Sequence, residues 1–317
     1  MILYPRSWTE LHVEKVVDTK ERYEVSCPYS SGFETLQLGK VEYQAAVDAK
    51  YFLLTYMRLE ENYLQVLYSL QNFEKFLTDS AIDHSIFPMH EFNETQDARV
   101  RANIFVSSFL NSVTGFRNQF PRTGSYKSAH QNFLLGWESA KRTSIAFAFG
   151  ERLRNYAQHQ SHPVSSITSG GGWNSAREHR ESHVTVYCDT IAVATDRGDA
   201  GERSNYTREF GRRADLTLIL REVAGKVGEM MKSARDFLKA DFNQAIKDYE
   251  SALSAGKQLS AENLVVRISK MVGSETPDSH DLFDEFVDRA RRLRRNFASV
   301  NNHQHFVSSR PRGHLNE

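Results

Sequence analysis

One short segment, residues 153–163, concentrates side chains that can bind phosphate and transfer protons, in the order LRNYAQHQSHP. Histidine, which occurs twice in this segment, is a side chain that can exchange a proton near neutral pH, because the unperturbed pKa of an imidazole is about 6.5. An arginine stays charged at physiological pH, and its planar donors match phosphate oxygens. These residue types suit phosphate chemistry without a metal, with histidine as general acid or base and arginine as the neutralising charge.

A helix over this segment would place several of these groups on one side. At 100° per residue, Arg152, Asn155, His159 and His162 recur at steps of three, four and three. Arg154 lies about 140° from His159 on the same helix. Two arginines therefore remain candidates for the phosphate role: Arg154 if the pocket is wide, and Arg152 if it is narrow.

Arg154, Asn155 and His159 form the pattern R-N-x-x-x-H near the predicted end of this helix. The pattern resembles the R-x4-6-H motif of HEPN-domain ribonucleases, and the resemblance covers about residues 45–165. The spacing alone has little specificity, since Arg152 to His159 and Arg177 to His183 also match it. The first match is favoured by its asparagine and by the two long predicted helices that precede it.

The resemblance implies a metal-independent endoribonuclease in which the ribose 2′-OH attacks the adjacent phosphate and leaves a 2′,3′-cyclic end. His159 would then be the general base or acid, Arg154 the phosphate stabiliser and Asn155 the orienting residue, with Arg152 and His162 in support. The family pairs two motifs across a shared cleft, so the resemblance implies a homodimer or pairing with a second HEPN-like half. It also implies RNA as the substrate, no cofactor, and a role as a toxin, phage-defence effector or RNA-processing factor with a cognate antitoxin or inhibitor.

Two alternatives remain open at this level. The helical body can be a non-catalytic HEPN-like module for dimerisation or for RNA or protein binding, with the motif as a solvated helix face. A metal-dependent hydrolase would use the histidine pairs His159–His162 or His179–His183. No carboxylate stands at a matching step beside the first pair, and REHRESH is not a metalloprotease motif, so we expect no metal site.

A second basic cluster lies near the C-terminal end of the last predicted helix and contains Arg289, Arg291, Arg292, Arg294 and Arg295. It is the densest positive patch in a chain whose 40 basic and 40 acidic residues cancel. An arginine run is most often a solvated helix end, but it can also follow an RNA backbone. We therefore treat Arg291, Arg292, Arg294 and Arg295 as candidate RNA contacts.

Composition indicates an ordinary globular protein of 317 residues without a global charge that would attract nucleic acid or membrane. Its 2 cysteines, Cys27 and Cys188, are expected to be reduced thiols. The N-terminus lacks the apolar segment of a signal peptide, and the longest apolar runs are too short to span a bilayer. We expect a cytoplasmic protein with no membrane partner.

The elements that must position these residues are mainly helical. We predict a strand or loop segment over 1–43, with YEVSCP as an edge strand, followed by a HEPN-like helical bundle over 44–163. A small antiparallel β segment is expected over 164–198, with SGGGW as its tip or loop. Additional helices are expected over 199–300, and a flexible tail over 301–317. The helices are expected at 44–79, 95–116, 129–147, from about 150 to before Pro163, 215–255, 260–271 and 281–300.

Overall fold

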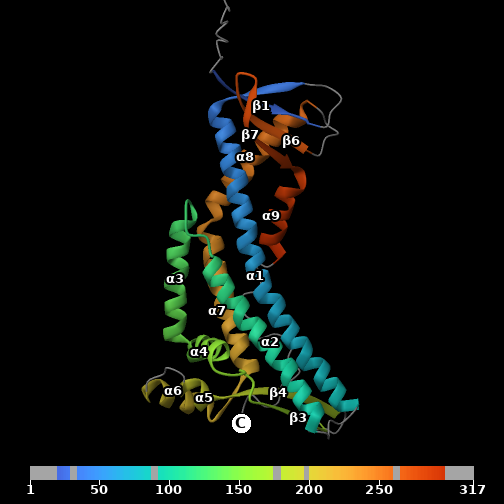
Figure 1. Cartoon of the computed structure of the whole chain (residues 1–317), viewed down its shortest axis with the longest axis vertical. Helices are drawn as coiled ribbons and strands as arrows, with labels where there is room; N and C mark the ends of the chain where they lie inside the picture. The colour runs from blue at the N-terminus through green and yellow to red at the C-terminus, as the bar shows by residue number, and fades with distance from the viewer. Residues whose placement is uncertain are drawn as a thin grey trace, which may run out of the picture. The chain divides into compact units, whose positions relative to one another are not determined.

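The computed structural model describes residues 20–28, 34–86, 92–173, 180–195, 200–259 and 265–296. The chain is mainly helical and carries two small antiparallel sheets, as Figure 1 shows. This confirms the predicted class of helices with antiparallel β structure. None of the helices in the described ranges combines the length and the apolar character needed to cross a membrane.

The chain divides into two compact units, each built from two separate segments. The first unit comprises Met1–Leu53 and Gln244–Asp288, and the second comprises Leu54–Asn243 and Arg289–Glu317. The five consecutive parts expected from the sequence stay a prediction, and the expected tail over 301–317 lies outside the residues that the structure describes.

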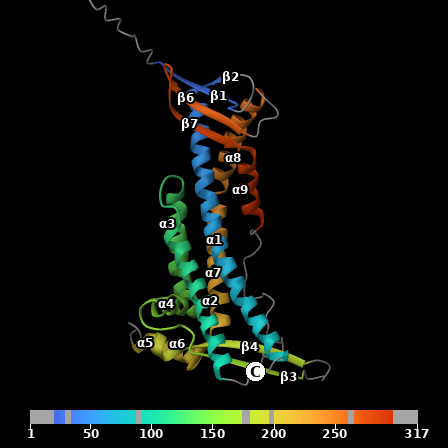
Figure 2. The same cartoon turned by 45° about the vertical axis from the view of Figure 1, so that its right-hand side comes forward.

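The first unit contains a four-stranded antiparallel sheet with the order β2-β1-β6-β7, and all four strands are labelled in Figure 2. The strands are β1 (Glu21–Ser26), β2 (Thr35–Leu38), β6 (Val265–Val272) and β7 (Glu275–Phe283). Val266 and Ile268 are buried at alternate positions of β6, as in a sheet with one covered face. Helix α8 (Lys239–Lys257) approaches this sheet closely, since a Cβ at Gly256 would collide with a methyl group of Val266.

Two sequence predictions for this sheet are wrong. YEVSCP does not form an edge strand, because β1 pairs with β2 on one side and with β6 on the other. The predicted helix over 260–271 is replaced by β6 from Val265 onward. A short apolar run fits both a helix and a strand, and the β-branched residues of VVRISKMV favour the strand.

The second unit contains most of the helices. They are the later part of α1 (Lys40–Ile86), then α2 (Phe92–Gln119), α3 (Tyr126–Thr143), α4 (Ile145–His159), α5 (Thr190–Thr195), α6 (Ala200–Phe210) and α7 (Leu216–Phe237). Helix α9 (Asp284–Asn296) crosses from the first unit to the second. The long helices predicted before the motif are confirmed, and α7 with α8 confirms the helical stretch predicted over 215–255.

The break between α3 and α4 lies at Ser144, so the fourth helix begins at Ile145 and not at about residue 150, as expected from the sequence. The Ser144 hydroxyl accepts a hydrogen bond from the backbone N–H of Phe147 at 3.1 Å. This side chain caps the first turn of α4 and so fixes where the helix begins. Gly150 lies inside α4.

The second unit also holds a three-stranded antiparallel sheet with the order β3-β4-β5. Its strands are β3 (Ser166–Trp173), β4 (Arg180–Asp189) and β5 (Arg213–Asp215). The hairpin is confirmed, but SGGGW belongs to strand β3 and is not its tip. The β-branched stretch TIAV forms α5, because the Asp189 carboxylate accepts hydrogen bonds from the N–H groups of Ile191 and Ala192.

Candidate functional site

A pocket of about 260 Å³ lies among four helices of the second unit. We name it the Arg154 pocket. Its lining residues are Leu110, Val113, Thr114 and Arg117 from α2, Trp137 and Lys141 from α3, Phe147, Gly150, Glu151, Arg154 and Asn155 from α4, and Val223 from α7. The α4 members recur at steps of three and one, so they share one face of that helix.

Helix α4 can present this face because it packs closely on α7. A Cβ at Gly150 would lie 2.6 Å from Cγ2 of Val223, a distance that real Cβ contacts do not reach. Glycine therefore permits the close approach at this position. Glu151 and Arg154 follow within one turn and are positioned by the same contact.

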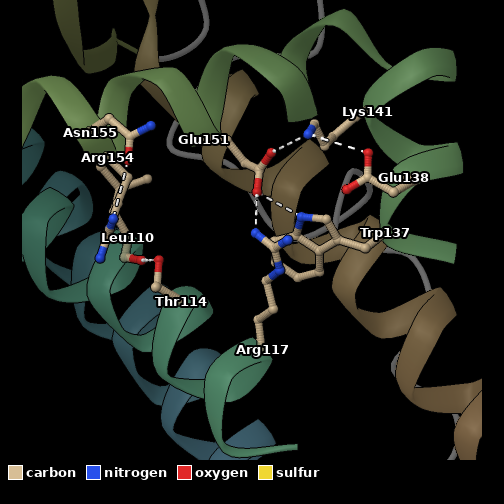
Figure 3. Close-up of polar contacts among 9 residues, drawn as sticks. All are labelled: Leu110, Thr114, Arg117, Trp137, Glu138, Lys141, Glu151, Arg154 and Asn155. Carbon is tan, nitrogen blue, oxygen red and sulfur yellow. Dashed lines mark hydrogen bonds and ion pairs between the residues drawn. The ribbon is translucent and has the colours of Figure 1, made fainter. Parts of the chain in front are cut away.

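Glu151 is the centre of the polar contacts in the pocket, as Figure 3 shows. It accepts hydrogen bonds from Trp137 Nε1 at 2.6 Å and Arg117 Nη1 at 3.1 Å, and it lies 3.5 Å from Lys141 Nζ. The Arg117 guanidinium also lies over the Trp137 ring, 4.9 Å from its centroid. One carboxylate thus holds two cations from two different helices beside the same indole.

Arg154 contributes a third cation. Its Nη1 donates to Oδ1 of Asn155 at 3.1 Å. Its Nε is buried and has no hydrogen-bond partner among the residues that the structure describes. A buried charged donor without an acceptor carries a large desolvation cost, so this atom marks a place where an acceptor is needed.

The charges that line the pocket do not cancel. Arg117, Lys141 and Arg154 are opposed by one lining carboxylate, Glu151, which leaves a formal excess of two positive charges. Side chains of Arg117 and Lys141 are 35% and 38% exposed, so water reaches them only in part. Partial removal from water strengthens their attraction for an anion. The arrangement is therefore suited to bind a negatively charged group.

The residues predicted from the motif separate into two groups. Arg154 and Asn155 both line the pocket and contact each other. His159 is the last residue of α4 and is exposed, and it does not line the pocket. Arg152 and His162 do not line it either, and His162 lies exposed beyond the end of the helix.

The four residues that form the polar contacts around Glu151 were not identified from the sequence: Arg117, Trp137, Lys141 and Glu151 itself. The spacing of Glu151, three residues before Arg154 and four before Asn155, is a helical signal that could have revealed it. Arg117, Trp137 and Lys141 lie on other helices, and only tertiary packing brings them here. No local pattern identifies them.

Within the C-terminal arginine cluster the structure gives Arg294 a role inside the fold. Its Nη1 donates to Tyr56 Oη at 2.8 Å, and its Nη2 donates to the backbone carbonyl of Arg235 at 2.9 Å. This guanidinium therefore makes structural contacts inside the fold, and contact of Arg294 with RNA stays a prediction. The other candidates, Arg291, Arg292 and Arg295, are exposed, and for them contact with RNA stays a prediction.

The residues that the structure describes contain no group of three or more histidine, cysteine, aspartate or glutamate side chains able to hold a metal ion. Arg177 and His179 lie outside the described residues. Cys27 and Cys188 are buried free thiols, as expected. Burial raises the pKa of the Cys188 thiol to about 12, which keeps it protonated and unreactive at neutral pH.

No protein-family model, curated protein or solved structure matches this chain. Two features of the chain bear on its function: the geometry of the Arg154 pocket and the R-N-x-x-x-H pattern.

Proposed function

We propose that this chain binds RNA by holding a phosphate group in the Arg154 pocket. The observation that carries the proposal is the buried Nε of Arg154, which has no acceptor in the part of the chain that the structure describes and lies in a pocket with excess positive charge. A phosphate oxygen is the acceptor that a guanidinium matches best, because the two can form paired charge-assisted hydrogen bonds. RNA is the proposed source of the phosphate because of the resemblance to HEPN-domain ribonucleases.

A second candidate function is metal-independent cleavage of the bound RNA in a HEPN-like bundle. His159 favours it, since this imidazole is exposed one helical turn beyond Asn155. Cleavage by the 2′-OH requires a group that accepts a proton and a group that returns one, and histidine can do either. Because His159 does not line the pocket of its own copy, we propose that catalysis uses the His159 of a second copy in a homodimer.

If the chain cleaves RNA, we propose that it acts in the cytoplasm as a toxin, phage-defence effector or RNA-processing factor. A cognate antitoxin or inhibitor would then cover the exposed end of α4. Expression should in that case arrest growth, and His159→Ala should relieve the arrest.

Incubation of purified protein with total RNA in EDTA separates the two candidates. The catalytic candidate predicts cleavage by the wild type, 2′,3′-cyclic phosphate ends, and loss of cleavage in His159→Ala. The binding candidate predicts no cleavage by either protein. Both predict that Arg154→Ala weakens RNA binding about tenfold or more, the value of one or two charge-assisted hydrogen bonds.

Arg152→Ala is the matched control, since Arg152 lies on the same helix outside the pocket. It should leave RNA affinity nearly unchanged. If Arg152→Ala abolishes binding and Arg154→Ala does not, the assignment of the phosphate site is wrong.

A mixing experiment tests whether His159 acts across an interface. If the chain cleaves RNA as the catalytic candidate states, Arg154→Ala and His159→Ala should each be inactive. A mixed dimer would keep one intact site, formed by His159 from one copy and Arg154 from the other. Random mixing should therefore restore roughly a quarter of the wild-type rate in a twofold dimer. No restoration would show that the two residues do not act in trans.

A further inference from the structure

We infer that the Arg154 pocket receives a phosphate monoester, the terminal phosphate of an RNA chain, and not a phosphodiester inside the chain. The inference rests on the proposed RNA binding and names the part of the RNA that the pocket recognises. It follows from the charge of the pocket, the number of its cations and its size.

The charge of the lining matches a monoester better than a diester. The lining residues carry a formal excess of two positive charges. A phosphate monoester carries between about −1.5 and −2 at pH 7, whereas each phosphodiester of a nucleic-acid backbone carries one negative charge. A monoester therefore neutralises the pocket, and a diester leaves part of its charge uncompensated.

The cations of the pocket come from three different helices. Arg117 projects from α2, Lys141 from α3 and Arg154 from α4, and Figure 3 shows Arg154 and Lys141 on opposite sides of Glu151. A monoester presents three strong acceptor oxygens, and a diester has two unbridged ones. A monoester therefore offers these cations more acceptor oxygens than a diester does.

The contacts of Glu151 position these cations without exhausting their donors. A guanidinium carries five N–H donors and an ammonium three. Arg117 gives one of them to Glu151, and Lys141 lies between Glu151 at 3.5 Å and Glu138 at 3.4 Å. Glu138 does not line the pocket and its side chain is 54% exposed, so water screens its charge.

The size of the pocket also favours a chain end. About 260 Å³ is below the range of roughly 300–1,000 Å³ that is usual for drug-sized ligands. Apolar side chains form much of the wall: Leu110, Val113, Phe147 and Val223. A phosphodiester needs room for chain on both of its sides, whereas a terminal phosphate needs only one opening.

Binding of matched 2′-O-methyl RNA 12-mers to the full-length protein tests the inference, because these oligonucleotides cannot be cleaved by 2′-OH attack. One carries a 5′-phosphate, one a 3′-phosphate, and one has hydroxyl groups at both ends. We expect one phosphorylated form to bind about tenfold or more tightly than the hydroxyl form, and inorganic phosphate to compete with it. The arm that gains affinity identifies which end the pocket holds, and competition by a mononucleotide shows whether the chain contributes to binding.

Variants connect the preference to the pocket. Arg117→Ala and Lys141→Ala should each reduce the preference for the phosphorylated end to less than about threefold, and Lys141→Arg should retain it. Arg142→Ala is the matched control, because Arg142 is the exposed neighbour of Lys141 on α3 and does not line the pocket. Unchanged helical circular dichroism and a cooperative melt confirm that each variant is folded.

The outcomes distinguish this inference from the proposed function. Equal affinity for phosphorylated and hydroxyl ends, with both weakened by Arg154→Ala, overturns the monoester and leaves RNA binding in place. Absence of RNA binding in every arm overturns the proposed function. A preference for phosphorylated ends that survives in both Arg117→Ala and Lys141→Ala also overturns the inference, because it places the recognition outside this pocket.

Discussion

Glu151 is the residue on which the geometry of the candidate site depends most. It binds the indole N–H of Trp137 and holds the charged groups of Arg117 and Lys141 with a side chain that is 25% exposed. We expect Glu151→Gln to keep the shape of the site but to leave the cations without their counter-charge. The free energy of unfolding, measured with urea, should fall by about 1–2 kcal/mol.

Glu138→Gln is the control for this prediction, because Glu138 touches only Lys141 among the pocket cations and is more exposed. An exposed ion pair contributes little, so its loss should change the free energy of unfolding by less than about 1 kcal/mol. Equal effects of the two variants would contradict the central position assigned to Glu151.

At the scale of single residues, the sequence identified two members of the site, Arg154 and Asn155. Arg154 and Asn155 could be predicted because their neighbours on the same helix form a recognisable pattern. His159 was expected to join them, but its position 140° from Arg154 on an ideal helix leaves it outside the pocket. Arg117 and Lys141 could not be predicted, because their partner Glu151 reaches them only after α2, α3 and α4 have packed.

At the scale of the elements, the contact between α4 and α7 determines where the α4 side chains lie. A Cβ at Gly150 would collide with Val223, a stiff β-branched residue that is itself buried. We expect Gly150→Ala to lower the free energy of unfolding by about 1–3 kcal/mol, as overpacked cores do. The same shift of α4 should weaken phosphate binding.

Gly115→Ala is the control, because this substitution should not lower the free energy of unfolding. Gly115 lies inside α2, and a Cβ there would meet nothing within 4 Å. Alanine is favoured over glycine in a helix by about 1 kcal/mol, so this variant should be as stable as the wild type or more stable. Destabilisation by both substitutions would show that close packing on Val223 is not the cause.

In the sheet of the first unit, acid should weaken an ion pair between two strands. Lys270 Nζ on β6 lies 2.7 Å from Glu21 Oε1 on β1. The hydrogen bonds from Lys270 and Tyr23 lower the pKa of Glu21 from 4.5 to about 2. A lowered folded-state pKa means that the stabilisation is present above pH 4.5 and is lost as the pH falls towards 2.

Glu21→Gln should therefore melt at a lower temperature than the wild type at pH 7, and the difference should shrink between pH 4.5 and 2. Melting curves by circular dichroism at several pH values measure this difference. A difference that stays constant over the whole range would exclude the carboxylate of Glu21 as its source.

The elements themselves were predictable where they are long. Helices such as α1 and α2 bury an apolar face over many turns, and that repeat is visible in the sequence. Strand β6 has only eight residues, and over that length the hydrophobic pattern is too short to distinguish a helix from a strand. Its partner β1 lies more than 200 residues away in the chain, and only the folded sheet shows that they pair.

For the molecule as a whole, the excess charge of the pocket predicts stabilisation by phosphate. A ligand that binds only the folded state raises its stability, by about 2.7 kcal/mol at 100 times its Kd. The melting temperature should rise with inorganic phosphate more than with chloride at the same ionic strength. Arg154→Ala should lose this additional rise, and an identical rise in the variant would assign the effect to general salt stabilisation.

The position of Trp137 has a practical consequence. Its indole donates to Glu151 and lies under the guanidinium of Arg117, so its excited state senses both charges. Replacement of Trp8 and Trp173 by phenylalanine would leave it as the sole tryptophan of the chain. An anion that enters beside it should then change the wavelength or intensity of its emission, so that occupancy can be followed optically without any attached dye.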